Sequence, residues 1–288
     1  MALELKGITK RFPGVLANED VSLSVAPGEV VALLGENGAG KTTLMNVLYG
    51  LYQPDAGTVA IDGQDISFTS TRDAIAAGIG MVHQHFMLVP VFSVAENVIL
   101  GQEPSGPLGV IDENAARRIV REISERYRLQ VDPDAIIEDL PVGIQQRVEI
   151  IKVLNREARY VIFDEPTAVL TPQEIEEFFA IIRGLKADGK GIIFITHKLG
   201  EAIELADRVV VLRGGRMVAE RKSAELDEQE CADLMVGRPV QLVVPKNLSA
   251  SGPTVLNVRD LVVLDDRGNR VVEGISFEVR SQKMTVSF

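Results

Sequence analysis

Eight residues near the start of the chain read Gly35-Glu36-Asn37-Gly38-Ala39-Gly40-Lys41-Thr42 and match the pattern G-x-x-x-x-G-K-[ST]. An apolar run of buried-strand type, Glu29–Leu34, precedes them, and a helical pattern, Lys41–Leu48, follows. A strand, a glycine-rich turn and a helix start form a cradle in which backbone N–H groups and the helix dipole face an anion. We therefore predict a nucleotide site in which Lys41 reaches the β- and γ-phosphates and the Thr42 hydroxyl ligates Mg²⁺.

Short apolar runs alternate with helical patterns along the rest of the chain. The strand candidates are Val21–Val25, Glu29–Leu34, Ile79–Val82, Tyr160–Phe163, Ile192–Ile195 and Arg208–Leu212. The helix candidates are Lys41–Leu48, Glu113–Tyr127, Ile144–Asn155, Pro172–Leu185 and Gly200–Leu205. Strands that alternate with helices predict βαβ units and a largely parallel sheet. The stretch from about Val91 to Asn155 is helical and predicts a subdomain inserted into this α/β core, while Glu220–Val236 is typical of a polar hairpin or helix.

Composition limits the classes of function. The net charge of −11 and the pI near 4.9 argue against a nucleic-acid-binding surface, which needs clustered Lys and Arg. The single cysteine, Cys231, excludes an intrachain disulfide, and we interpret it as an inert apolar residue on a helix. No run approaches the ~18 apolar residues that span a bilayer, and no signal peptide opens the chain. We expect a protein that is cytoplasmic or peripheral to a membrane.

The opening of the chain recurs near its end. The run Val255–Leu261 resembles Leu3–Ile8, and Ile275–Val279 parallels Val21–Val25. The repeat predicts a complete domain at 1–240, a linker at 241–253 with Pro, Ser, Asn and Gly, and the start of a second copy at 254–288. The second copy stops at Phe288, the counterpart of Leu34, and carries Gln282-Lys283 where the first has Gly28-Glu29. We expect no nucleotide site in the second copy.

A second apolar strand, Tyr160–Phe163, ends in the acids Asp164 and Glu165. Asp164 at the strand end suits the role of holding Mg²⁺ together with Thr42. Glu165, one residue later, can polarise an attacking water as a general base. The alternative is that these acids cap the helix that begins near Pro172. The guanine-recognition motif N-K-x-D is absent, which disfavours a GTPase.

Further polar residues follow predicted strands or begin helices. His197 comes after Ile192–Ile195 and could sense the γ-phosphate or orient water, and Gln84 could contact Mg²⁺ or the water. Its neighbours His83 and His85 are interpreted as structural or surface residues, because H-x-H alone is weak evidence for a metal site. The segment Leu140–Gln145 precedes an amphipathic helix, where Gly143 would let backbone amides approach a phosphate.

The chain resembles an ATP-binding-cassette (ABC) ATPase from about Leu3 to Val240. The motifs fall in that family's order: Gly35–Thr42, Gln84, Leu140–Gln145, Asp164-Glu165 and His197. The resemblance implies a P-loop NTPase core with a mostly parallel sheet, an antiparallel β subdomain and an inserted helical subdomain at about 91–155. It also implies that Phe12 stacks on adenine. The alternative is that Phe12 is buried in the core.

The resemblance implies ATP and Mg²⁺ as cofactors and a site shared between two cassettes that close head to tail. The implied catalytic residues are Glu165, His197 and Gln84, and the implied metal ligands are Thr42, Gln84 and Asp164. The implied nucleotide-binding residues are Phe12, Gly35, Glu36, Asn37, Gly38, Ala39, Gly40, Lys41, Thr42 and Thr43, with Leu140, Val142 and Gly143 contributed across the dimer.

Two segments depart from the family pattern. Pro141, Val142 and Ile144 stand where the signature L-S-G-G-Q has Ser, Gly and Gln, so a phosphate contact of the Ser hydroxyl is lost. Thr171 stands where Asp is common, which puts the usual coupling across the interface in doubt.

Both departures recur among tandem-cassette importers of the simple-sugar and nucleoside type. Further matches to that group are His83–Pro90, Ser93–Asn97 and Leu234–Arg238, while Gln145–Ile150 and Asp164–Glu174 lean toward the nucleoside branch. This resemblance implies an ATPase at the cytoplasmic face of the cell membrane, bound to integral-membrane permease subunits and through them to a solute-binding protein.

In that group residues Gln84–Gly101 would form the groove for a permease helix. Two alternatives stay open: a soluble tandem-cassette ATPase that acts on ribosomes or nucleic acid, and a fragment that binds ATP without turnover.

Overall fold

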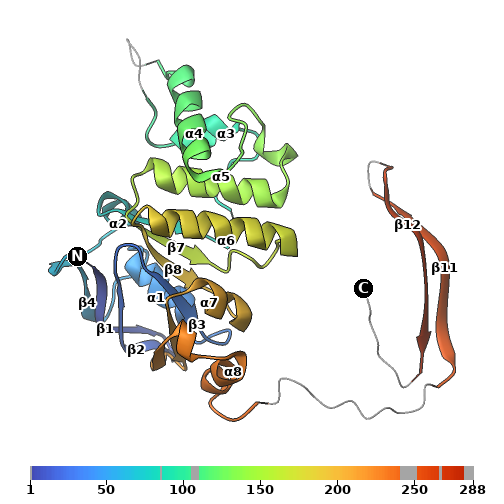
Figure 1. Cartoon of the computed structure of the whole chain (residues 1–288). Coiled ribbons are helices and arrows are strands. Elements are labelled where there is room, and N and C mark those ends of the chain that lie inside the picture. The colour runs from blue at the N-terminus through green and yellow to red at the C-terminus, as the bar shows by residue number, and fades with distance from the viewer. Residues whose placement is uncertain (1, 85, 105–109, 241–251, 266–267, 282–288) are drawn as a thin grey trace. The chain divides into compact units, whose positions relative to one another are not determined.

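The computed structural model describes residues 2–84, 86–104, 110–240, 252–265 and 268–281. The chain divides into two units, Met1–Val240 and Gln241–Phe288, which are described separately below (Figure 1). The predicted linker lies almost wholly outside the described residues. No described helix combines the length and apolarity that crossing a bilayer requires.

The first unit contains ten strands and eight α-helices within its described residues. The strands are β1 (Leu3–Phe12), β2 (Val15–Val25), β3 (Val30–Leu34), β4 (Ala56–Ile61), β5 (Gln64–Ile66), β6 (Ile79–Val82), β7 (Tyr160–Asp164), β8 (Gly191–Ile195), β9 (Arg208–Arg213) and β10 (Arg216–Lys222). The helices are α1 (Lys41–Leu48), α2 (Thr71–Ala76), α3 (Val94–Ile99), α4 (Glu113–Tyr127), α5 (Val142–Asn155), α6 (Pro172–Ala187), α7 (Leu199–Leu205) and α8 (Glu228–Val236), with short 3₁₀ turns η2 (Ile137–Asp139) and η3 (Ser223–Glu225).

The main sheet has six strands in the order β10-β9-β3-β8-β7-β6. The five strands β9, β3, β8, β7 and β6 are parallel to one another, and the edge strand β10 is antiparallel to β9. Every residue of β3, β7 and β8 is buried, because both faces of the sheet are covered. One face packs on helices such as α5 and α6, and the other packs on α1 and the antiparallel sheet. The predicted α/β core with a mostly parallel sheet is confirmed.

A second sheet, β2-β1-β4-β5, is antiparallel and forms the expected β subdomain. The strand predicted at Val21–Val25 is longer than expected, since β2 begins at Val15 and pairs with β1 from its first residue. Polar residues Asn18, Glu19 and Asp20 interrupt the alternation of apolar side chains there, and register shifts accompany them. The sequence pattern therefore revealed only the apolar half of this strand.

Three helices form the inserted subdomain between β6 and β7. Helices α3, α4 and α5 contact one another, and α5 also contacts β6 (Figure 1). The long helix α4 is strongly amphipathic, with Ala116, Val120 and Ser124 on its buried face. Its bounds match the predicted helix at Glu113–Tyr127, because a regular apolar period and the Asp112 cap define both register and start.

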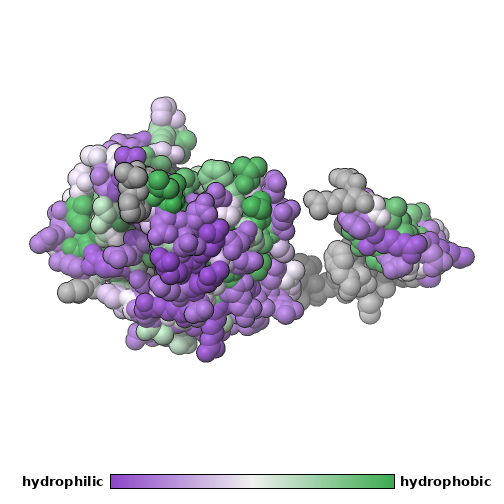
Figure 2. Space-filling model, turned by 90° about the horizontal axis from the view of Figure 1, so that it is seen from above, coloured by the Kyte–Doolittle hydropathy of each residue, from purple (hydrophilic) through white to green (hydrophobic). Residues whose placement is uncertain are grey.

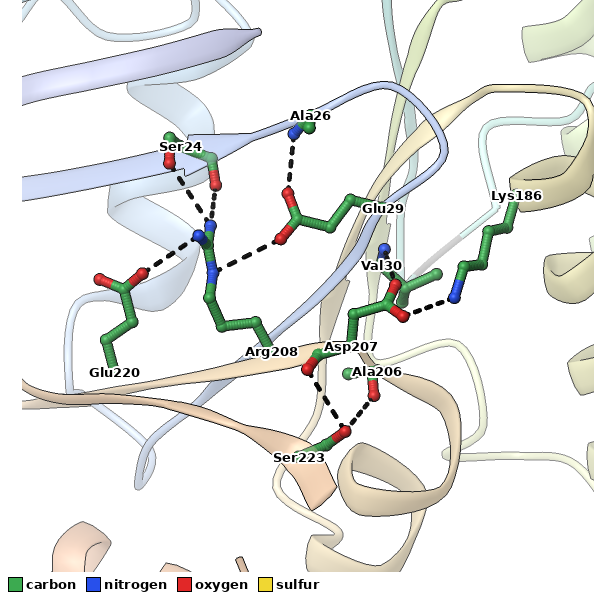
Figure 3. Close-up of polar contacts among 10 residues, drawn as sticks. All are labelled: Ser24, Ala26, Glu29, Val30, Lys186, Ala206, Asp207, Arg208, Glu220 and Ser223. Atoms are coloured by element: carbon green, nitrogen blue, oxygen red, sulfur yellow. Dashed lines mark hydrogen bonds and ion pairs between the residues drawn. The ribbon is translucent and has the colours of Figure 1, made fainter. Parts of the chain in front are cut away.

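A polar network joins the two sheets where β3 and β9 begin (Figure 3). The Asp207 carboxylate accepts a hydrogen bond from the backbone N–H of Val30 at 2.9 Å and another from Lys186 Nζ at 2.6 Å. Next to it, the Arg208 guanidinium pairs with Glu220 at 3.2 Å and donates to the Ser24 carbonyl of β2. The network thus ties β2 of the antiparallel sheet to the start of the parallel sheet.

The described part of the second unit is a hairpin of β11 (Thr254–Leu264) and β12 (Arg270–Arg280). Its register repeats that of β1 and β2: Leu256 faces Val279 as Leu3 faces Val25, and Val258 faces Phe277 as Leu5 faces Leu23. Asp260 donates its N–H to Ser276 Oγ at 2.9 Å, as Gly7 does to Ser22 Oγ at 2.9 Å. The sequence repeat is therefore also a repeat of hairpin structure, while Gln282-Lys283 and Phe288 lie outside the described residues.

Candidate nucleotide-binding site

Four neighbouring parallel strands bring the predicted site residues to one edge of the sheet. Strand β3 leads into Gly35, β7 ends at Asp164, β8 leads to His197, and β6 leads to Gln84. Leu33 pairs with Ile195 and Ile195 pairs with Asp164, so these strand ends lie level with one another. Ligands of open α/β sheets bind outside the carboxyl ends of the strands, which is the edge formed here.

The loop Gly35–Thr42, called the phosphate loop below, packs so tightly at both ends that a side chain there would clash with neighbouring backbone. A Cβ on Gly35 would lie 2.5 Å from the Leu212 carbonyl oxygen. Gly40 has φ of +101°, and a Cβ there would lie 2.3 Å from the Ala17 carbonyl oxygen. Glu36, Asn37 and Gly38 between them are exposed. The two glycines therefore pack the ends of the loop against the core while its middle stays open to a ligand.

Lys41 is almost completely buried at the start of α1. Its Nζ donates to the Gly35 carbonyl at 2.7 Å and to the Glu36 carbonyl at 3.1 Å, so the ammonium group lies within the curve of the loop. Burial lowers the pKa of Lys41, while Glu165 and Asp164 act in the opposite direction. A phosphate bound in the loop would offer this partly desolvated cation a charged acceptor in place of neutral carbonyls.

Asp164 and Glu165 lie at the end of β7 with different surroundings. Burial raises the pKa of the Asp164 carboxyl, Glu165 raises it further and Lys41 lowers it. Glu165 has φ of +47°, which turns the chain sharply after the strand, and its N–H donates to the Ile195 carbonyl at 3.0 Å. The adjacent acids therefore do not share one environment: Asp164 is buried near Lys41, and Glu165 is half-buried.

Glu165 is paired with His197 from the next strand. Glu165 Oε1 lies 3.3 Å from His197 Nδ1, and about half of the His197 side chain is exposed. Glu201 on α7 joins the two loops that carry this pair, since it accepts from Thr167 Oγ1 at 2.5 Å and pairs with Lys198 Nζ at 3.0 Å. A carboxylate and an imidazole held in this way can orient a water molecule and take up its proton.

The residues after β6 lie beside these groups in the fold. Gln84 is exposed, and His85 lies outside the described residues. His83 packs edge-on against Tyr49 with ring centroids 5.7 Å apart, and burial together with the nearby Lys152 lowers its pKa. This packing agrees with the interpretation of His83 as a structural residue. On α5, Glu149 accepts from the Met87 N–H and Lys152 donates to the Met87 carbonyl, both at 2.7 Å.

Phe12 is on the surface at the end of β1 rather than in the core. Its ring is 36% exposed and contacts Tyr52 edge-on with centroids 5.3 Å apart. Lys10 Nζ lies 5.5 Å from the centre of the same ring. An exposed aromatic ring supported by a second aromatic ring provides a flat apolar surface of the kind that bases stack on.

The Leu140–Gln145 segment lies in a different part of the domain. A Cβ on Gly143 would lie 2.5 Å from Glu174 Oε1, so α5 and α6 approach closely only because residue 143 is glycine. The Gln145 side chain donates to the Leu140 carbonyl at 2.9 Å. In the described chain, no hydrogen bond or ion pair joins Leu140, Val142 or Gly143 to the phosphate loop. The predicted site residues therefore form two separate groups.

Thr171 has a clear local role at the start of α6. Its hydroxyl accepts from the Glu174 N–H and donates to the Glu174 carboxylate, which also accepts from the Thr171 N–H. This reciprocal capping box satisfies the helix start. The alternative that Asp164 and Glu165 cap this helix is therefore wrong.

The donor atoms of the strand-end group fit a hard cation. Thr42 is exposed in the first turn of α1 and offers a hydroxyl, and Asp164 offers a carboxylate. Within the described residues no three His, Cys, Asp or Glu side chains gather as a metal-binding group. One carboxylate and one hydroxyl suit Mg²⁺, which keeps water ligands and is usually completed by phosphate oxygens. Cys231 is buried on α8 with its pKa raised to about 11, so it behaves as the inert residue expected.

Asn18 is a residue of this region that the sequence analysis missed. It is fully buried in β2, and its side-chain Nδ2 donates to the Gly40 carbonyl of the phosphate loop at 3.1 Å. No sequence signal pointed to it, because the predicted strand began at Val21 and left Asn18 outside.

Comparisons with known proteins agree with this geometry. A family model described as ABC transporter matches residues 18–168. The chain is 47% identical over 279 residues to the nucleoside import ATP-binding protein NupA of Lactococcus lactis subsp. cremoris (strain MG1363), which covers 97% of this chain and 55% of that protein. It is 49% identical over 279 residues to the guanosine import ATP-binding protein NupO of Bacillus subtilis (strain 168), covering 97% of this chain and 54% of that protein.

The chain thus spans about half the length of the curated relatives it matches. Among solved structures, the ADP conformation of MJ1267, an ATP-binding cassette of an ABC transporter, matches with a TM-score of 0.73 and 27% identity. The match covers 83% of this chain and 100% of that one.

Proposed function

Because this chain belongs to the ABC transporter family, we propose that it binds and hydrolyses ATP to power an importer of a nucleoside or a simple sugar. The observation that carries the proposal is the arrangement at the strand ends. The side chains of Lys41 and Asp164 are buried in one site, and Glu165 is paired with His197 at 3.3 Å. The relatives named above are import proteins for nucleosides, which supports transport over action on ribosomes or nucleic acid.

The roles follow from the surroundings of each residue. The amides of Gly35–Thr43 and the Lys41 ammonium bind the phosphates of ATP. Thr42, Asp164 and Gln84 would hold Mg²⁺, which would neutralise phosphate charge. Glu165 takes the proton of the attacking water and His197 orients that carboxylate.

The base of the nucleotide has its own surface. Phe12 stacks on adenine, with Tyr52 supporting the ring from its edge.

The second group of predicted residues acts on a nucleotide bound to another cassette. Val142 and Gly143 begin α5, and Leu140 lies just before it. None of the three has a described hydrogen bond to the phosphate loop, and Val142 is 45% exposed. A helix N-terminus without an acidic first turn favours an anion. The site is completed when this segment covers the ATP bound to a partner cassette. Relatives of about twice this length have room for both cassettes in one chain.

A groove beside the helical subdomain is the surface for a permease partner. It has a volume of about 550 Å³, and its lining includes Leu51, Ile75, Met81, Met87 and Leu100. Apolar floors of this kind accept the apolar face of a short helix. The chain would then work at the cytoplasmic face of the membrane, with a solute-binding protein delivering cargo to the permease. Only part of the predicted range Gln84–Gly101 lines this groove, and residues of α2, β6 and α5 complete it.

Two substitutions test the proposed chemistry separately. Glu165→Gln removes the general base but leaves Asp164, so Mg-ATP binding is retained while hydrolysis falls by about 10²–10⁴-fold. Lys41→Ala instead weakens Mg-ATP binding itself, because a buried phosphate-directed charge is lost. Fluorescence titration and a steady-state ATPase assay measure the two effects. Loss of binding in Glu165→Gln would contradict the assignment of Glu165, and wild-type chain that does not bind Mg-ATP would refute the proposed function.

A further inference from the structure

The buried side chain of Asn18 has an incomplete set of hydrogen bonds. Its Nδ2 donates to the Gly40 carbonyl at 3.1 Å, but no partner contacts its Oδ1 in the described structure. A buried polar atom without a partner lowers stability. A leucine has the same branched skeleton but no amide oxygen to leave unpaired, so the amide at this position is explained by what its one bond does.

That bond is made to the residue that begins α1. Gly40 is the N-cap of α1 with left-handed backbone, and no side chain of its own caps the helix. Its carbonyl precedes Lys41 and Thr42, whose backbone groups form the end of the phosphate cradle. The Gly40 carbonyl also accepts from the Leu44 N–H of α1 at 2.9 Å, so the Asn18 bond is a second restraint on this peptide unit and ties it to β2. Because the peptide is planar, restraining this unit also restrains the direction of the amides that follow.

Neighbouring backbone bonds enclose the same corner of the loop. The Gly215 N–H, from the turn between β9 and β10, donates to the Ala39 carbonyl at 3.1 Å, and the Glu19 N–H donates to the Gly215 carbonyl at 2.8 Å. Glu19 also pairs with Arg216 at 2.6 Å. The end of the phosphate loop is thus held between β2 on one side and the β9–β10 turn on the other. Asn18 supplies the only described side-chain bond to Gly40 in this corner.

We propose that Asn18 is a positioning residue for nucleotide binding: it orients the Gly40 peptide so that the start of α1 is preorganised for a phosphate. The proposal rests on the proposed function, since it concerns the same nucleotide site. Preorganised donors bind an anion more tightly because no ordering is needed on binding. Asn18 therefore raises nucleotide affinity at the expense of stability.

This trade-off gives a test in which nucleotide affinity and the stability of the nucleotide-free chain change in opposite directions. For Asn18→Leu we expect Mg-ATP to bind about tenfold more weakly, the effect of one hydrogen bond. The melting temperature of the nucleotide-free chain stays the same or rises, since the unpaired oxygen is gone. If leucine prevents folding, Asn18→Ala allows the same affinity measurement. Ser124→Ala is the control, because it removes a buried hydrogen bond to Val131 far from the loop and lowers stability while leaving affinity unchanged.

Each outcome has a definite meaning. Weaker binding by a variant that is as stable as the wild type supports the positioning role, which a purely structural residue would not produce. Unchanged Mg-ATP affinity in Asn18→Leu or Asn18→Ala, with wild-type chain that binds, overturns this inference alone. Wild-type chain that does not bind Mg-ATP overturns the proposed function and this inference together.

Discussion

In the nucleotide-free chain, the charged forms of Asp164 and Lys41 lower the stability of the folded state. The pKa of Asp164 is raised, first by burial, and that of Lys41 is lowered, first by burial. Each charged form is therefore less favourable in the folded state than in water. Both groups become better matched when a phosphate and a cation are bound, which is the usual relation between stability and function at a binding site.

Asp164 makes this cost measurable as a function of pH. A raised carboxyl pKa means that the folded state binds the proton more tightly, so ionised Asp164 lowers stability above its folded pKa and the loss is recovered as pH falls through that value. We predict that Asp164→Asn raises the melting temperature of the nucleotide-free chain by a few degrees at pH 7.5. The gap should shrink as the pH is lowered toward 4.

Thermal unfolding of both proteins over this pH range measures the effect. Glu125→Gln, at an exposed position of α4, serves as the control and should show no such gap. A gap that widens at low pH would contradict the assigned burial of the Asp164 charge.

Polar contacts that no local sequence pattern predicts hold some strands and helices together. Asp207 lies directly before β9, and Arg208 is its first residue. Together they bind β3, α6, β2 and β10 through the network of Figure 3. The bonds to β3 and β2 join residues far apart in sequence, with 177 residues between Val30 and Asp207 and 184 between Ser24 and Arg208. This network holds the antiparallel sheet on the parallel one, and so places Phe12 and Asn18 relative to the phosphate loop.

We predict that Asp207→Ala lowers the free energy of unfolding by about 1–3 kcal/mol, because the Val30 N–H and the Lys186 ammonium lose their acceptor. Urea unfolding followed by circular dichroism measures the change. The exposed Glu122→Ala on α4 is the matched control and should change stability by no more than about 0.5 kcal/mol. Equal effects of the two substitutions would show that the network does not stabilise the domain.

Each of the two units, taken by itself, has apolar residues on its surface. In the first unit Val142 at the start of α5 is exposed, and in the second unit the hairpin β11–β12 exposes several apolar residues. Leu256 and Phe277 of the hairpin are 49% and 45% exposed, whereas their counterparts Leu3 and Leu23 in the first unit are buried. Figure 2 shows hydrophobic and hydrophilic residues side by side on the surface of the second unit. We propose that the hairpin is the first part of a second cassette.

A site shared by two cassettes predicts a concentration dependence. If the Leu140–Gly143 segment must come from a partner, two copies of this chain have to meet before ATP is hydrolysed. We expect the ATPase rate of the purified chain to rise with the square of its concentration until dimers saturate. Mixing with an excess of Glu165→Gln chains should alter that dependence. A rate strictly proportional to concentration would mean that one cassette suffices, and no activity at any concentration would favour an ATP-binding fragment without turnover.

The sequence determined the parts of this protein that depend on local pattern. Residues 35–42 define the phosphate loop, because the glycine spacing occurs between a strand pattern and a helix pattern. The loop motif sets the start of α1, and the Asp112 cap with the apolar period sets the bounds of α4. The order of the motifs was also sufficient for the family. Even the repeat of the β1–β2 hairpin in β11–β12 was visible as matching apolar positions.

Only the tertiary structure decided how distant residues act on one another. The pairing of Glu165 with His197, the burial of Lys41 beside Asp164, and the bond from Asn18 to Gly40 join segments separated by strands and helices. The Thr171 cap is different in kind, since Thr171 and Glu174 have the local T-x-x-E spacing of a capping box. Hydrogen bonds and desolvation depend on where side chains meet in space, and a linear pattern specifies which residues are apolar but not which polar groups they enclose.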